Sequence, residues 1–165
     1  MQKKLLNWMQ WLKPSRIGIH EEYTSAKDTL QAMSRFLTEN LDVAEGFSDA
    51  LVRREQEYPT GLPTEPFGVA IPHADGRYVL RPGLVVWTMK TPVLFREMGN
   101  PQNQVMVKLV LLIALPGANQ DGQTEILQGI AGLIQTPGFL QDVDGCRDAD
   151  QLLNVFTRYY NEVSF

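Results

Sequence analysis

The feature that most constrains the fold is the apolar run VMVKLVLLIAL at residues 105–115, which Lys108 alone interrupts with a charge. A membrane-spanning helix needs about 18 apolar residues, so this run is too short to cross a bilayer. A strand that is buried on both faces reads as a nearly continuous apolar run instead of an alternating one. We therefore expect residues 105–115 to form a central strand of a sheet that is covered on both faces.

The segments on either side of this run predict helices and further strands. The expected helices span residues 24–37, 46–58, 124–135 and 148–160, and the other expected strands span 67–71 and 84–89. Residues 59–66 hold three prolines and predict a loop. This order favours an α/β fold in one domain, with a mixed β-sheet of about five strands flanked by helices on both faces.

Composition excludes several classes of function. The formal charge of −4 argues against a nucleic-acid partner. The single cysteine, Cys146, cannot form an internal bridge and has no zinc-type spacing, which favours a cytoplasmic location. The chain has no phosphate-binding loop, no dinucleotide fingerprint and no nucleophile elbow. We therefore predict no cofactor and no metal.

Residues 1–16 form a basic amphipathic N-terminal segment, and we expect the domain proper to span residues 17–165. The basic residues of the segment are Lys3, Lys4, Lys13 and Arg16. Its apolar residues fall on one helical face and are Leu5, Trp8, Met9 and Leu12. Such a face can pack on its own domain or a sister chain, which we favour, or it can lie on a membrane surface.

His73 lies at the edge of an expected strand, in the stretch FGVAIPHADG at residues 67–76. Pro72 fixes its own φ and pushes Ile71 towards an extended conformation, so the imidazole is held rigidly between a stiff proline and small residues. A neutral imidazole is a good nucleophile near pH 7. The residues alone leave both a packed structural histidine and a nucleophile open.

Arg53 and Arg54 lie near the end of the helix expected at 46–58. Cations at a helix C-terminus also suit the helix dipole, so a solvated helix end explains them without a function. The functional interpretation is that one of them binds an anion, because the planar guanidinium offers two parallel hydrogen bonds to a phosphate.

The segments REQEYPTGL, GVAIPHA and VLLIALPGANQDGQTEIL together resemble enzyme IIA of the mannitol/fructose type, from the phosphoenolpyruvate-dependent sugar phosphotransferase system. The family pattern is an Arg-Glu pair, three residues, Pro-Thr, and then a strand that ends in Ala-(Ile/Val)-Pro-His. Here the pattern falls on residues 54–55, 59–60 and 70–73. The resemblance runs from about residue 17 to the C-terminus.

The resemblance implies that His73 accepts a phosphoryl group from the histidine-containing phosphocarrier protein, as a tele-phosphohistidine. The group would then pass to a IIB component, and the sugar would be phosphorylated during uptake through a membrane IIC component. By the same resemblance, Arg54 would stabilise the phosphoryl group and Thr60 would lie near it as a hydrogen-bond donor. We also expect Gly61, Leu62, Pro63 and Phe67 to form the rim on which partners dock.

The chain departs from the family pattern at one site position. Many members carry a second histidine before the helix that follows the central strand, and here Gln123 stands at that place. Glutamine can donate a hydrogen bond but cannot carry the charge of an imidazolium. With EYPTG before the strand, this glutamine resembles the galactitol-type branch. A regulatory IIA-like protein of the nitrogen-related type and an inactive binding domain remain the alternatives.

Overall fold

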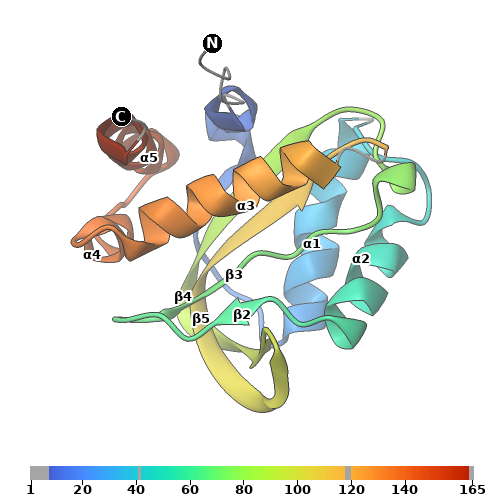
Figure 1. Ribbon diagram of the computed structural model, residues 1–165, viewed down its shortest axis with the longest axis horizontal. Helices are drawn as coiled ribbons and strands as arrows, with labels where there is room; N and C mark the ends of the chain where they lie inside the picture. Colours follow the sequence, from blue (N-terminus) through green and yellow to red (C-terminus); the bar gives the residue numbers. More distant parts are fainter. Residues whose placement is uncertain (1–7, 41, 118–119, 164–165) are drawn as a thin grey trace.

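The computed structural model describes residues 8–40, 42–117 and 120–163, in which helices and strands form one layered domain (Figure 1). The strands are β1 Ile17–Glu21, β2 Gly61–Leu62, β3 Gly68–Ala70, β4 Gly83–Glu97 and β5 Asn100–Ala114. The α-helices are α1 Ala26–Glu39, α2 Phe47–Glu57, α3 Gln120–Gln135, α4 Phe139–Asp144 and α5 Ala149–Val163. The short 3₁₀ helices are η1 Trp8–Trp11, η2 Pro14–Arg16 and η3 Gly76–Tyr78. None of the helices in these ranges is long and apolar enough to cross a membrane.

The sheet is mixed. β4 and β5 form a long antiparallel hairpin, β1 runs parallel to β4, and β3 runs parallel to β5 and antiparallel to β2. The expected central strand lies in β5, between β4 and β3. Its side chains alternate between two buried clusters: Leu109, Leu111 and Ile113 pack on one face, and Val110, Leu112 and Ala114 on the other. Burial on both faces explains why this run is apolar throughout.

Two helical layers cover the two faces of the sheet (Figure 1). Helices α3, α4 and α5 lie on one face, and α1 and α2 lie on the other. The predicted α/β fold, with a five-stranded mixed sheet between helices, is confirmed. The cap of α1 forms locally, because the Asp28 N–H donates to the Ser25 hydroxyl at 3.0 Å.

The structure differs from the sequence-based prediction mainly in short or polar segments that form regular secondary structure. The prediction of a strand over 84–89 was too short, because β4 continues to Glu97 through three exposed residues, Lys90, Thr91 and Pro92. Strand pairing shifts register between Thr88 and Val93, which accommodates the proline. Strand β2 has two residues and lies in the segment predicted as a loop, and α4 has six residues and was not predicted.

The described part of the N-terminal segment packs against the domain. Trp8 and Leu12 are buried in the same cluster as α3 and α5, and the Trp8 ring meets Tyr160 edge-on at 5.5 Å. Lys3, Lys4 and Leu5 lie outside the described residues.

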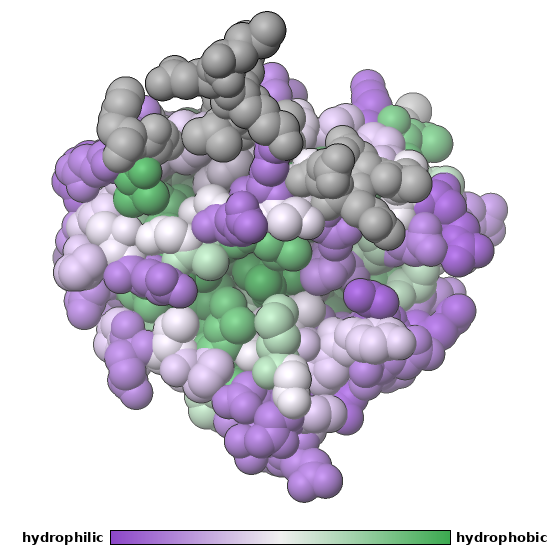
Figure 2. Space-filling view, in the orientation of Figure 1, coloured by the Kyte–Doolittle hydropathy of each residue, from purple (hydrophilic) through white to green (hydrophobic). Residues whose placement is uncertain are grey.

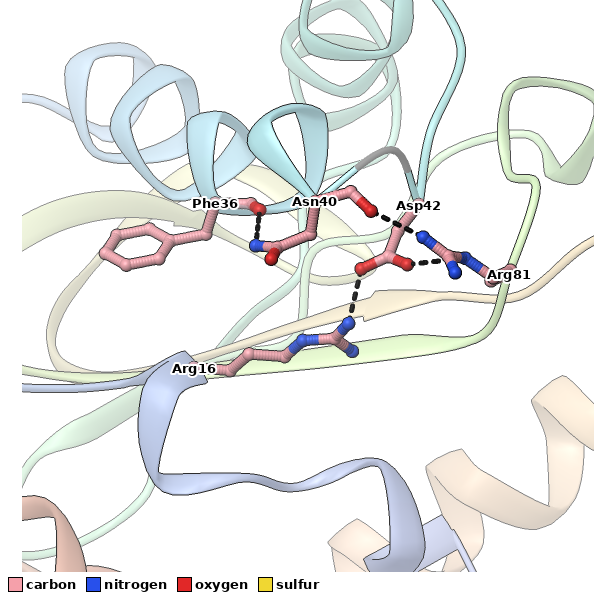
Figure 3. Close-up of polar contacts among 5 residues, drawn as sticks. All are labelled: Arg16, Phe36, Asn40, Asp42 and Arg81. Carbon is pink, nitrogen blue, oxygen red and sulfur yellow. Dashed lines mark hydrogen bonds and ion pairs between the residues drawn. The ribbon is translucent and has the colours of Figure 1, made fainter.

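Arg16, which the sequence groups with the basic segment, is a buried cation in the structure. It pairs with the buried Asp42 carboxylate, which also accepts from Arg81 Nε at 3.0 Å (Figure 3). This cluster ties the chain before β1 to the loops that follow α1 and precede β4.

Candidate functional site

His73 is fixed against the end of the central strand. Two residues after β3 the chain reaches Pro72, whose carbonyl accepts from the Ile113 N–H at 3.0 Å. His73 itself forms a parallel β-bridge with Ile113. The backbone of His73 is thus held by β5, while its side chain stays partly exposed.

The imidazole of His73 is oriented by its own backbone. Nδ1 lies 2.9 Å from the Ile71 carbonyl oxygen, and a carbonyl can only accept, so Nδ1 carries the hydrogen. In the neutral ring, Nε2 therefore holds the lone pair. Burial lowers the pKa of His73, the bond to Ile71 opposes this, and the Arg54 guanidinium lowers the pKa further. The ring is consequently neutral near pH 7, as a nucleophile requires.

A cavity of about 710 Å³ opens beside His73. Helix α2 contributes Ala50, Arg53, Arg54 and Glu57, which share one helical face. The other lining residues are His73, Ala74, Asp75, Gly76, Arg77, Tyr78, Ile113, Leu115, Gly117 and Gln123. The structure therefore brings His73, Arg54 and Gln123 to one cavity, although they are far apart in the sequence.

Arg54 is held without an ion pair among the described side chains. Its guanidinium carbon lies 4.2 Å from the centroid of the Tyr58 ring, one helical turn further along. Arg54 is exposed. The pKa of Asp75 is lowered mainly by Arg77, and the charge of Arg54 lowers it further. The cavity thus holds a cation next to a neutral nucleophile.

Thr60 is buried beside Glu55, three residues after the end of α2. It is 2% exposed, it does not line the cavity, and its hydroxyl lies 2.9 and 3.1 Å from the two carboxyl oxygens of Glu55. The Thr60 N–H donates to Glu55 at 2.8 Å, and the Thr60 carbonyl accepts from the Ile71 N–H at 3.4 Å. Thr60 therefore links the end of α2 to the strand that leads to His73. Burial raises the pKa of Glu55 to about 7, against the opposing bonds from Thr60.

Sequence reasoning missed the segment after His73. Arg77 lines the cavity and pairs with Asp75 at 2.9 Å, while the Asp75 carboxylate also accepts from the Arg77 N–H. The segment is pressed against the loop after β5: a Cβ on Gly76 would lie 2.0 Å from the Gly117 carbonyl oxygen. The available signal was an arginine four residues after the Pro-His motif.

Charge in the cavity favours a bound anion. The lining holds three arginines and two carboxylates, and one arginine is already paired with a carboxylate. No group of three or more His, Cys, Asp or Glu side chains within the described ranges is placed to hold a metal ion.

Comparison with known proteins assigns the chain to a family. Residues 10–159 match the family described as "Phosphoenolpyruvate-dependent sugar phosphotransferase system, EIIA 2". The chain belongs to this family. It has a phosphotransfer role in the sugar phosphotransferase system, and the resemblance stated from the sequence motifs is confirmed.

Relatives of this EIIA domain support a galactitol-like branch and the same fold. It is 30% identical over 117 residues to the PTS system galactitol-specific EIIA component of Escherichia coli (strain K12), across 71% of this chain and 75% of that one. Enzyme IIAMTL of Escherichia coli, in a complex with phosphorylated enzyme IIBMTL, superposes with a TM-score of 0.74 at 17% identity, across 89% of this chain and 97% of that one. The nitrogen regulatory protein IIA-Ntr of Neisseria meningitidis gives a TM-score of 0.71 at 19% identity, across 90% and 97%.

Proposed function

We propose that His73 accepts a phosphoryl group at Nε2 from the histidine-containing phosphocarrier protein and passes it to a cysteine of a IIB component. A membrane IIC component would then use that group during sugar or polyol uptake, so the reaction belongs in the cytoplasm. The observation that supports this most is the bond from Nδ1–H to the Ile71 carbonyl, which leaves the lone pair on Nε2. This is the tautomer that a tele-phosphohistidine requires.

The transfer balances with groups that the two proteins supply. The Nε2 lone pair attacks phosphorus while the bond from phosphorus to the carrier's histidine breaks, and that histidine keeps the electron pair. His73 keeps the proton on Nδ1, so its ring gains positive charge as the new bond forms. The Ile71 carbonyl, 2.9 Å away, stabilises that charge. Positioning and charge stabilisation supply most of the catalysis in such transfers.

The cavity residues take distinct roles in this proposal. Arg54 would bind the phosphoryl oxygens, since its donors have no carboxylate partner among the described residues. Gln123 would donate a neutral hydrogen bond from the first turns of α3. Thr60 would act indirectly, because its hydroxyl is engaged by Glu55.

Docking surface for the partners is expected beside the cavity. Figure 2 shows hydrophobic surface gathered in a hollow between α3 and the strands β2 and β3. Leu62 and Phe67, which the sequence suggested as rim residues, are partly buried at the edge of this layer. A modest interface of this kind suits a partner that binds and leaves. Backbone chemical-shift mapping with the phosphocarrier should show perturbations at these two residues, and perturbations confined to the opposite face would refute the placement.

The direct test is the intact mass after incubation with phosphoenolpyruvate, enzyme I and the phosphocarrier. We expect wild type to gain one phosphoryl group and His73→Gln to gain none. His20→Asn is the matched control: it removes the other histidine, which is exposed on β1, and asparagine tolerates its φ of 52°. Loss of the mass gain in the control but not in His73→Gln would overturn the assignment.

A regulatory role is the second candidate, because IIA-Ntr shares this fold. The two roles differ in where the phosphoryl group goes. Rapid loss of the group to a purified IIB component supports uptake. A phosphorylated protein that is stable with every IIB component from the same cell supports regulation. Failure of wild type to gain a phosphoryl group from a demonstrably phosphorylated carrier supports an inactive binding domain.

A further inference from the structure

Tyr58 has an exposed side chain that contacts Arg54. Tyr58 follows the last residue of α2 and is 58% exposed, which is unusual for a large aromatic residue with no place in the core. The Arg54 guanidinium carbon lies over its ring, 4.2 Å from the ring centroid. Arg54 lines the cavity beside His73, whereas Tyr58 does not. The ring therefore touches the site only through the arginine.

The backbone around Tyr58 is held by hydrogen bonds. The Tyr58 N–H donates to the Arg54 carbonyl at 2.8 Å, so the cation–π pair spans the final turn of the helix. Pro59 follows with a fixed φ, and Thr60 is then anchored to Glu55 through its N–H and its hydroxyl. The backbone from which the Tyr58 ring projects is therefore restrained on both sides.

Stacking holds a cation in a way that an ion pair cannot. A guanidinium presents its five N–H donors in the plane of the group, so an aromatic ring beneath it leaves all five available. Arg77 shows the contrast within the same cavity, because the Asp75 carboxylate already occupies one of its NH₂ groups at 2.9 Å. Among the described residues neither Arg53 nor Arg54 has an ion-pair partner, and Arg54 is the one whose guanidinium contacts an aromatic ring.

We propose that Tyr58 is a positioning residue that holds Arg54 at the His73 cavity with its donors free for the incoming phosphoryl group. The inference rests on the proposed function, in which Arg54 binds that group. It adds a residue that acts through Arg54 and touches no substrate atom.

The experiment is a double-mutant cycle on single-turnover transfer from the phosphorylated carrier. The variants are Tyr58→Leu, Tyr58→Phe, Arg54→Gln and the double variant Arg54→Gln/Tyr58→Leu. Cation–π pairs at exposed sites correspond to about a two- to fivefold effect. We expect Tyr58→Leu to lower the maximal rate by about that factor, with the half-saturating carrier concentration unchanged, and Tyr58→Phe to restore it because the ring remains. In the Arg54→Gln background, Tyr58→Leu should have no further effect.

Three outcomes would overturn the inference. Tyr58→Leu could transfer as fast as wild type, or it could slow transfer equally in the Arg54→Gln background, which would give Tyr58 a direct contact with the carrier. A change in half-saturating carrier concentration alone would assign Tyr58 to docking.

A second measurement needs no carrier and separates this inference from the proposed function. The His73 imidazole is titrated by NMR in the same four variants and in wild type. Tyr58→Leu should raise the pKa of His73 towards the Arg54→Gln value, because the released guanidinium no longer repels the imidazolium, and Tyr58→Phe should not. This pattern holds even if wild type accepts no phosphoryl group, which would refute the proposed function alone. An unchanged pKa in Tyr58→Leu would refute the positioning role alone.

Discussion

Replacement of Glu55 by glutamine should change how the stability of the protein depends on pH. Glu55 is 8% exposed, and burial raises its pKa from 4.5 to about 7 in the folded protein. Thr60, Arg96 and Arg54 all oppose that rise and do not cancel it. The folded state therefore keeps a proton on Glu55 at pH values where the unfolded chain has released it.

The sign and size of the effect follow from linkage. Stability from the raised pKa is fully present below pH 4.5 and is lost as the pH rises through about 7. At about 1.36 kcal/mol per pKa unit the loss is about 3 kcal/mol, of which about 2.5 kcal/mol falls between pH 5 and pH 8. Glutamine has nearly the same shape, and its oxygen can still accept from the Thr60 N–H, yet it cannot ionise. As the pH rises from 5 to 8, the free energy of unfolding of Glu55→Gln should therefore increase by about 2.5 kcal/mol relative to that of wild type.

Urea denaturation of wild type and Glu55→Gln at pH 5 and pH 8 measures this difference. The other titrating groups contribute equally to the pH dependence of both proteins, so their contributions cancel. Thr60→Ser keeps the hydroxyl and should leave the wild-type pH dependence unchanged. Thr60→Val removes a bond that lowers the pKa of Glu55, so its stability should fall more steeply with pH than that of wild type. The same difference between Glu55→Gln and wild type at both pH values would refute the reasoning.

Three further outcomes follow from the structure. Arg54→Gln should raise the pKa of His73 in an NMR titration, because it removes a cation that destabilises the imidazolium; an unchanged value would place the two groups too far apart to interact. Gln123→Ala should slow phosphoryl transfer by about two- to tenfold, the range for one neutral hydrogen bond, and transfer at the wild-type rate would remove Gln123 from the site. Trp8→Ala should lower the free energy of unfolding by about 3–5 kcal/mol in urea, since Trp8 is 2% exposed; a loss below about 0.5 kcal/mol would contradict its burial in the core.

The layered fold could be predicted because its strongest signals are periodic. Burial on both faces makes the central strand apolar throughout, and the buried stripe Leu30, Met33 and Leu37 identifies α1. The sequence does not show how far each strand extends or which strands pair with each other. Residues 90–92 are exposed and end the apolar run that begins at Leu84, so the sequence does not show that β4 continues beyond them to Glu97. The turn of β1 at His20 has positive φ and interrupts the alternation that would reveal an edge strand.

The candidate site was predictable in part for the same reason. His73 and Arg54 lie in a motif whose residues are recognisable, but spacing alone could not bring them together, and Arg77 had no motif to mark it. Within that motif, some residues line the cavity and others are buried behind them. Arg54 and His73 line the cavity, whereas Glu55 and Thr60 are buried and bond to each other. Neighbours in the sequence thus have opposite environments, which follows from the helix: adjacent residues point about 100° apart.

The two halves of the motif are joined in this structure through its buried residues. The distance between Arg54 and His73 depends on how the end of α2 is joined to β3, and the antiparallel pairing of β2 with β3 is part of that connection. Glu55 and Thr60 add to it: the carboxyl binds Thr60 twice, and the Thr60 carbonyl binds the Ile71 N–H. Ile71 in turn supplies the carbonyl that sets the His73 tautomer. A change at Glu55 should therefore reach the nucleophile through three successive bonds, while a change at Arg54 should alter charge and leave that path intact.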